Sequence, residues 1–103
     1  MINVLLADDH DLVRMGMRRL LEDNNELNII AEATSGEEAV SLCRDESIHV
    51  VLMDINMPGM GGMEATKKIV QRDGSIKVII VTMNEDEVLA QKLLKLGAAG
   101  YLT

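Results

Sequence analysis

Apolar and polar positions divide this chain into two alternating kinds of segment. Short runs of aliphatic and β-branched residues predict buried strands, and longer stretches with apolar residues three or four apart predict amphipathic helices. The predicted strands cover residues 2–7, 27–33, 50–54, 77–82 and 100–103. The predicted helices cover 11–23 and 86–96, together with one that begins after Ser35 and one that follows Gly61-Gly62 and runs to about residue 71. This alternation predicts a parallel sheet with right-handed crossovers and helices on both faces.

Local signals refine this pattern. Ser35 followed by Glu38 fits a capping box, which predicts a helix start. Asn28 and Glu32 make the second strand more polar than the others, so we expect it at a sheet edge. The run 50–53 is apolar at every position, which predicts a strand buried on both faces.

Three of the predicted strands are followed by, or end on, polar side chains. Asp8 and Asp9 follow the first strand, Asp54 ends the third, and Thr82 ends the fourth. Taken alone, Asp54 is either a strand-end cap or a reactive carboxylate. Because ligands of such sheets bind beyond the carboxyl ends of the strands, we expect three carboxylates and a hydroxyl to meet at one edge.

Such a cluster has to be neutralised. Two carboxylates ~4 Å apart repel by about 4 kcal/mol at an effective dielectric of ~20, so either a proton or a divalent cation is expected among them. An all-oxygen set with few ligands suits Mg²⁺ better than Ca²⁺. We interpret His10 and His49 as isolated and solvated, which argues against a zinc site. A bound Mg²⁺ would bridge to a phosphoryl group and leave one carboxylate free as a nucleophile.

Composition excludes several other functions. A length of 103 residues predicts one domain. A net charge of −7 and a single aromatic residue, Tyr101, argue against nucleic-acid binding by this domain. No apolar run approaches the ~20 residues of a membrane span. The acidic N-terminal segment is unlike a signal peptide and the lone Cys43 fits a reducing compartment, so we expect a cytoplasmic location.

Together these residues resemble the CheY-like receiver domain of bacterial two-component response regulators. Asp8-Asp9, Asp54 with Met57-Pro58-Gly59, and Thr82 carry the resemblance. Within this family it is similar to the NarL/FixJ class, particularly the GacA/UvrY-type regulators, through segments 6–10, 12–14, 61–65 and 97–102. The resemblance implies a flavodoxin-like, doubly wound, five-stranded parallel sheet of order 2-1-3-4-5. It also implies a phosphoacceptor that is phosphorylated by a sensor histidine kinase and switches a DNA-binding output domain for transcription regulation.

The resemblance assigns roles around the metal. Asp54 is the expected phosphoacceptor. Asp9 is expected to bind Mg²⁺ directly and Asp8 chiefly through water, with Asp54 and the backbone carbonyl of Asn56 completing the protein ligands.

It also assigns a switch. Thr82 is expected to hydrogen-bond a phosphoryl oxygen, and Tyr101 to turn inward when Thr82 moves. Asn56 and Asn84 are expected to tune dephosphorylation. The face formed by the fourth helix and fifth strand is one expected homodimer surface.

The end of the chain departs from the family pattern. The resemblance implies a lysine three residues beyond Tyr101 and then a fifth helix, whereas this sequence stops at Thr103. We therefore expect residues 1–103 to form a receiver truncated before the lysine, with the fifth helix and the output domain absent. The sheet face left uncovered is a second expected homodimer surface.

Two other function classes compete with this interpretation. Mg²⁺-dependent phosphohydrolases of the haloacid-dehalogenase type also use an aspartyl nucleophile, but they carry a second acidic residue two positions later. Here that position is Asn56, which cannot transfer the needed proton. Flavin binding would require a hydroxyl-rich phosphate loop and stacking aromatics, which the sequence lacks. We therefore expect a signalling phosphoacceptor that promotes only its own phosphorylation and dephosphorylation.

Overall fold

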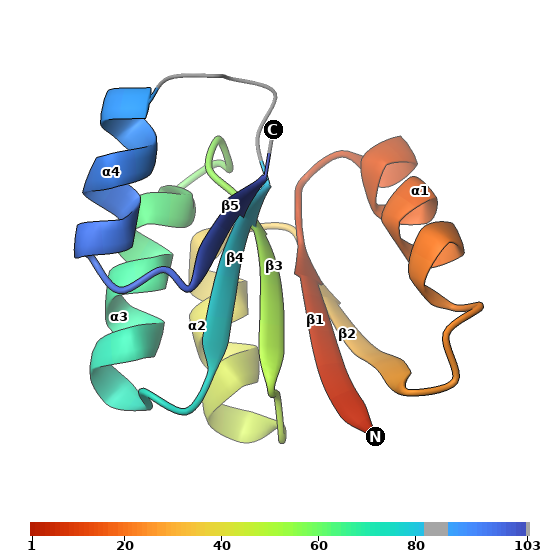
Figure 1. The fold of residues 1–103 in the computed structure, drawn as a ribbon. Coiled ribbons are helices and arrows are strands. Elements are labelled where there is room, and N and C mark those ends of the chain that lie inside the picture. Colours follow the sequence, from red (N-terminus) through yellow and green to blue (C-terminus); the bar gives the residue numbers. More distant parts are fainter. Residues whose placement is uncertain (82–86, 103) are drawn as a thin grey trace.

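Five parallel strands form one sheet in the order β2-β1-β3-β4-β5 (Figure 1). The computed structural model describes residues 1–81 and 87–102. The strands are β1 (Ile2–Ala7), β2 (Leu27–Ala33), β3 (Val50–Asp54), β4 (Lys77–Val81) and β5 (Gly100–Leu102). The helices are α1 (Asp11–Leu21), α2 (Gly36–Asp45), α3 (Gly61–Arg72) and α4 (Glu87–Lys95). The predicted fold class and strand order are confirmed, and the predicted element boundaries agree to within about two residues where the structure describes them.

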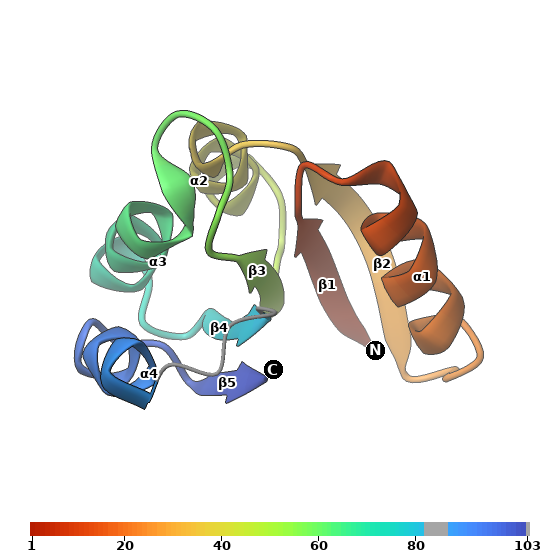
Figure 2. The same cartoon turned by 90° about the horizontal axis from the view of Figure 1, so that it is seen from above.

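The helices cover the two faces of the sheet unequally. Figure 2 shows α2, α3 and α4 on one face and α1 on the other. The main core lies between the sheet and the three-helix layer, where apolar strand residues meet small and aliphatic helix residues. Its strand members include Val51, Met53, Val78 and Ile80, and its helix members include Ala39, Ala65, Ile69 and Leu93.

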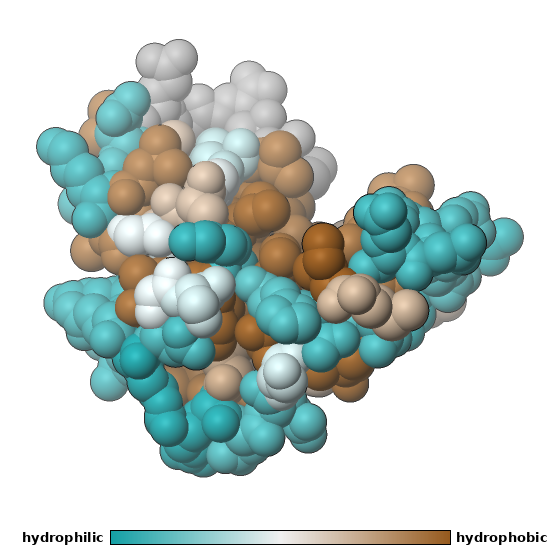
Figure 3. Space-filling model, turned by 60° about the horizontal axis from the view of Figure 1, so that its bottom comes forward, coloured by the Kyte–Doolittle hydropathy of each residue, from teal (hydrophilic) through white to brown (hydrophobic). Residues whose placement is uncertain are grey.

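The prediction that β3 is buried on both faces is wrong. Val51 and Met53 are fully buried under the three-helix layer, but Val50 and Leu52 on the opposite face are only half-buried. The reason is that α1 lies over β1 and β2, near one edge of the sheet, whereas β4 and β5 lie toward the other edge. Figure 3 shows apolar surface in the hollow between α1 and the remainder of the molecule.

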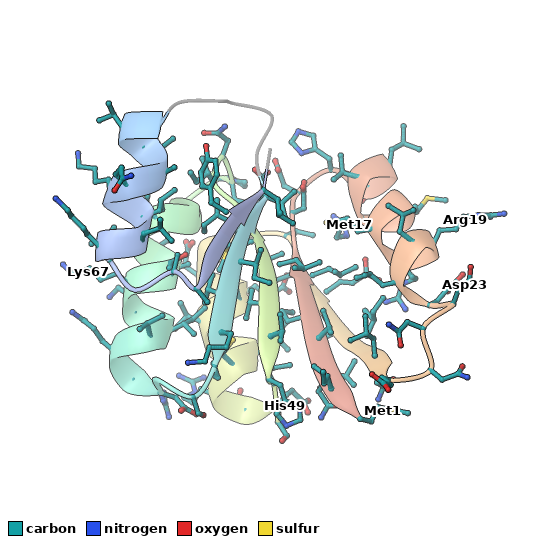
Figure 4. All side chains as sticks on the ribbon, in the orientation of Figure 1. Met1, Met17, Arg19, Asp23, His49 and Lys67 are labelled. Atoms are coloured by element: carbon teal, nitrogen blue, oxygen red, sulfur yellow. The ribbon has the colours of Figure 1, made fainter. Side chains whose placement is uncertain are left out.

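Polar residues of helix α1 bind the helix to the sheet. None of its residues is fully buried; Met17 points toward the sheet, whereas Arg19 points away from it (Figure 4). The carboxylate of Glu32 accepts from Arg14 Nε at 2.9 Å and from Arg18 Nη2 at 2.6 Å. These ion pairs explain why a polar residue stands in β2, which is the edge strand that the sequence predicts.

The predicted start of α2 is confirmed at Ser35. The Ser35 hydroxyl accepts from the backbone N–H of Glu38 at 3.1 Å. The Glu38 carboxylate in turn accepts from the N–H of Thr34 at 2.7 Å, one residue before the cap. The two bonds satisfy backbone donors at the point where the chain turns from β2 into α2.

Among the described residues, none of the helices is both long enough and apolar enough to cross a membrane.

A close backbone approach holds α3 against the end of β3. A Cβ atom on Gly62 would lie 2.2 Å from the carbonyl oxygen of Asp54. The Gly62 N–H donates to the carbonyl of Ile55 at 3.0 Å, so the helix begins directly on the segment that carries Asp54. Only a residue without a side chain allows this packing.

We therefore predict opposite effects at two helical glycines. Gly62→Ala should lower the free energy of unfolding by about 1–3 kcal/mol, the usual cost of overpacking a filled site. Gly16→Ala, in the interior of α1 with nothing within 4 Å of an added Cβ, should raise it by about 0.5–1 kcal/mol. Chemical denaturation of the two variants tests this. Equal effects of the two substitutions would contradict the close approach at Gly62.

Candidate functional site

Strands β1 and β3 bring the acidic residues together at the carboxyl edge of the sheet. The two strands pair in parallel with Ala7 opposite Met53, so Asp8 and Asp54, the next residues, stand side by side. Ligand atoms of Asp8, Asp9, His10 and Asp54 all lie within 4.8 Å of one another. The prediction that three carboxylates meet here is confirmed, whereas Thr82 and Asn84 lie outside the described residues.

The three carboxylates differ in their exposure to water. The side chains of Asp8 and Asp54 are 7% and 12% exposed, against 31% for Asp9. Asp8 is also fixed through its backbone, because its N–H donates to the Ala33 carbonyl at 3.0 Å and its carbonyl accepts from Arg14 Nη1 at 2.6 Å. Asp9 is therefore the carboxylate best placed to meet an ion that arrives from solvent.

Burial raises the pKa of Asp54 above the ordinary value of an aspartate. The Asn56 N–H, which donates to Asp54 Oδ1 at 3.2 Å, acts in the opposite direction, and the negative charges of Asp8 and Asp9 raise the pKa further. His10 lowers it slightly. The structure therefore holds Asp54 in a place where its negative charge is disfavoured until a cation compensates it.

His10 belongs to the cluster, so its interpretation as isolated is wrong, although it is exposed to solvent as expected. Its ring is 61% exposed, yet Nδ1 lies 2.7 Å from Asp8 Oδ1 and 3.2 Å from Asp9 Oδ1. The hydrogen bond to Asp8 and the charge of Asp9 raise the pKa of this histidine. The only sequence signal for this placement is that His10 directly follows Asp8-Asp9. That signal is informative only when the geometry of the turn after β1 is known. His49 also has a partner, because its Nδ1 accepts from the N–H of Asn3 at 2.8 Å, at the opposite end of the sheet (Figure 4).

The loop between β3 and α3 is held from α2 by Glu37, a residue that the sequence analysis missed. Glu37 Oε1 accepts from the backbone N–H of Met60 at 2.7 Å, and this bond lowers the pKa of Glu37. Gly59 and Gly61 have φ values of 72° and 77°, which favour glycine. The sequence signal for Glu37 is weak, because an acidic residue in the first turn of a helix is common without any such partner.

Asn56 lies next to the acidic cluster, whereas Tyr101 lies farther away across the sheet. Asn56 is exposed and lies two residues after Asp54, to which its N–H donates, so its backbone is adjacent to the site. Tyr101 stands on β5 opposite Ile80 of β4, is half-buried and packs against the core. The structure thus separates Tyr101 from the acidic cluster by strand β4.

The donor chemistry of the cluster fits a small divalent cation. Carboxylate oxygens are preferred ligands of Mg²⁺, which normally keeps several waters as well. Asp9 and Asp54 would hold such an ion through their oxygens, with Asp8 on the inner side. The acidic edge of the sheet can therefore collect a cation and the phosphoryl oxygens that the cation attracts.

A parallel sheet of this order, with three aspartates at the carboxyl ends of β1 and β3, is typical of receiver domains. The profile of the response regulator receiver domain matches residues 4–103, so the chain belongs to that family. It is 50% identical to the response regulator UvrY of Escherichia coli K12 over all 103 of its residues, which are 47% of UvrY. The chain thus spans about half the length of the curated relatives it matches. The predicted resemblance to GacA/UvrY-type receivers is confirmed.

Solved structures agree with this assignment. A LuxR-family two-component response regulator from Aurantimonas sp. SI85-9A1 is 41% identical with a TM-score of 0.91, over 96% of this chain and 71% of that one. A CheX–CheY complex with BeF₃ and Mg²⁺ from Borrelia burgdorferi is 30% identical with a TM-score of 0.94, over 99% of this chain and 77% of the matched chain.

The raised pKa of Asp54 predicts that its ionisation destabilises the fold. A carboxyl group whose pKa is raised by folding lowers the free energy of unfolding once the pH rises above the pKa that the group has in the unfolded chain, ~3.9 for aspartate. Asp54→Asn should therefore raise the free energy of unfolding at neutral pH by about 1 kcal/mol or more, since like charges at ~4 Å repel by about 4 kcal/mol and His10 offsets a part. Thermal melts across pH measure the difference, which should vanish below about pH 3.

The exposed Asp23→Asn variant is the matched control and should leave stability within about 0.5 kcal/mol. Mg²⁺ should stabilise the unmodified chain and reduce the advantage of Asp54→Asn. A destabilised Asp54→Asn protein at neutral pH would show that the carboxylate is well compensated without a cation.

Proposed function

We propose that Asp54 is the phosphoacceptor of this receiver domain and that the domain works as a phosphorylation switch. The observation that carries the proposal is the meeting of Asp54 with Asp8 and Asp9 at one sheet edge, with ligand atoms within 4.8 Å. A carboxylate in this place can act as a nucleophile, and the two carboxylates beside it attract a cation.

The residues have separate roles in phosphoryl transfer. A bound Mg²⁺ supplies positive charge that offsets the carboxylates and the phosphoryl oxygens. Asp9, Asp54 and the backbone carbonyl of Asn56 would hold the ion, and Asp8 would bind it chiefly through water. An Asp54 oxygen attacks the phosphorus, an acyl phosphate bond forms, and the bond to the leaving group of the donor breaks.

The donor is a sensor histidine kinase, whose phosphohistidine has a good leaving group in neutral imidazole. The relatives that the chain matches are about twice as long, which supports an output domain for DNA binding in the whole protein. We place this signalling in the cytoplasm, where the ATP that phosphorylates the histidine of such a kinase is available.

Thr82 and Tyr101 form the switch in this proposal. Thr82 follows β4 and binds a phosphoryl oxygen, and Tyr101 lies on the neighbouring strand β5, where its ring packs against the core. A movement of Thr82 toward the phosphoryl group makes room for the ring to turn inward. The face formed by α4 and β5 then changes and binds a partner or a second copy, while Asn56 and Asn84 set the rate of dephosphorylation.

An aspartyl-nucleophile phosphohydrolase is not favoured by this site. That reaction requires an acidic residue two positions after the nucleophile, and Asn56 stands there. The domain is accordingly a phosphoacceptor whose only reactions are on its own Asp54.

Covalent labelling tests the phosphoacceptor. Acetyl phosphate with Mg²⁺ should add one phosphoryl group to the chain, and intact-protein mass spectrometry should find none on Asp54→Asn or in the presence of a chelator. The Asp23→Asn variant should be labelled like the unmodified chain. Undiminished labelling of Asp54→Asn would remove Asp54 from this role.

The fluorescence of Tyr101 tests the switch, because it is the only aromatic residue of the chain. Beryllofluoride with Mg²⁺ should change the tyrosine emission of the unmodified chain. Thr82→Ala should reduce this change at least about threefold while still permitting acetyl-phosphate labelling of Asp54, since ~0.7 kcal/mol of lost coupling suffices for such a reduction. An unchanged response in Thr82→Ala would contradict the coupling.

A further inference from the structure

The side chain of His10 is directed into the acidic cluster although the residue is the N-cap of α1. An N-cap side chain commonly accepts a hydrogen bond from the first helical turn, but His10 makes no such bond. Its backbone N–H donates to Asp8 Oδ1 at 2.8 Å, and its Nδ1 lies 2.7 Å from the same oxygen. Two contacts therefore hold the imidazole over the carboxylates.

The distances from Nδ1 to the oxygens of Asp9 and Asp54 lie between those of neighbouring and opposite ligands of one metal ion. In an octahedron with bonds of ~2.1 Å, neighbouring ligand atoms are about 3.0 Å apart and opposite ones about 4.2 Å apart. His10 Nδ1 lies 2.7 Å from Asp8 Oδ1, 3.2 Å from Asp9 Oδ1 and 3.8 Å from Asp54 Oδ2. An ion held by Asp9 and Asp54 can therefore take the imidazole as a further ligand without a change in the backbone.

We propose that His10 is a nitrogen ligand that extends the metal preference of the site from Mg²⁺ to first-row transition-metal ions, with Mn²⁺ and Ni²⁺ as examples. The proposal rests on the proposed function, since it uses the same cluster that would hold Mg²⁺. Imidazole is a poor ligand for Mg²⁺, which prefers oxygen and retains its waters, and a good one for Ni²⁺. His10 thus determines selectivity, while the aspartates supply the binding that every divalent ion shares.

The alternative role of His10 is that of a hydrogen-bond donor which any arriving cation displaces. In that case its removal would affect all divalent ions alike. A carboxylate site without His10 would itself bind Ni²⁺ more tightly than Mg²⁺, so tighter Ni²⁺ binding alone does not separate the two roles. They are separated by how much the removal of His10 changes the affinity for each ion.

Calorimetric titrations of Mg²⁺ and Ni²⁺ into the chain, at about pH 8, above the ordinary pKa of an imidazole, test the proposal. His10→Ala should weaken Ni²⁺ binding at least about tenfold, since the loss of even a residue that only orients a metal ligand costs roughly 10–100-fold. Mg²⁺ affinity should change by less than about threefold, as oxygen ligands dominate for that ion. His10→Asn, which supplies a preferred N-cap residue, should behave in the same way.

His49→Ala is the matched control, since this second histidine lies at the opposite end of the sheet. It should leave both affinities unchanged. Pulsed electron paramagnetic resonance of bound Mn²⁺ should show coupling to a nitrogen, and His10→Ala should remove that coupling.

Equal changes in Mg²⁺ and Ni²⁺ affinity, or Mn²⁺ without nitrogen coupling, would overturn the inference. Neither measurement uses a phosphoryl donor. A failure of His10 as a ligand would therefore leave Asp54 labelling intact, and a failure of labelling would leave the metal titrations to be judged by themselves.

Discussion

The mutual repulsion of Asp8, Asp9 and Asp54 is the constraint on which this structure depends. Parallel pairing of β1 with β3 places these carboxylates at one edge, where two of them are largely shielded from water. Such an arrangement costs free energy in the absence of a positive charge, and the pKa of Asp54 is accordingly raised, first by burial and then by the charges of Asp8 and Asp9. The fold therefore favours the binding of a cation at the edge of the sheet where a phosphoryl group would be bound.

The surroundings of the cluster are organised to maintain this arrangement. Arg14 binds the backbone of Asp8 and joins α1 to Glu32 of β2, so the acidic turn cannot move independently of the sheet. On the other side, Glu37 holds the loop after β3 through Met60. Gly62 lets α3 begin directly against the end of β3. Each contact limits how far the carboxylates can separate to relieve their repulsion.

Much of this was predictable from the sequence, because the strand pattern fixes which residues share an edge. The alternation of strands and helices predicted the sheet, and the aspartates after 2–7 and at the end of 50–54 predicted the cluster. The contacts of His10 and Glu37 could not be predicted, because they depend on the turn geometry after β1 and on a loop that approaches α2 from 23 residues away. The half-exposed face of β3 was also missed, since an apolar run does not reveal which face a helix will cover.

The pKa of Asp54, measured by carboxyl carbon nuclear magnetic resonance with and without Mg²⁺, tests most directly whether a cation resolves the repulsion at this edge. Without divalent ions the pKa should lie above the ordinary ~3.9 of an aspartate, and saturating Mg²⁺ should lower it below that value. An ordinary pKa for Asp54 that Mg²⁺ leaves unchanged would contradict the account.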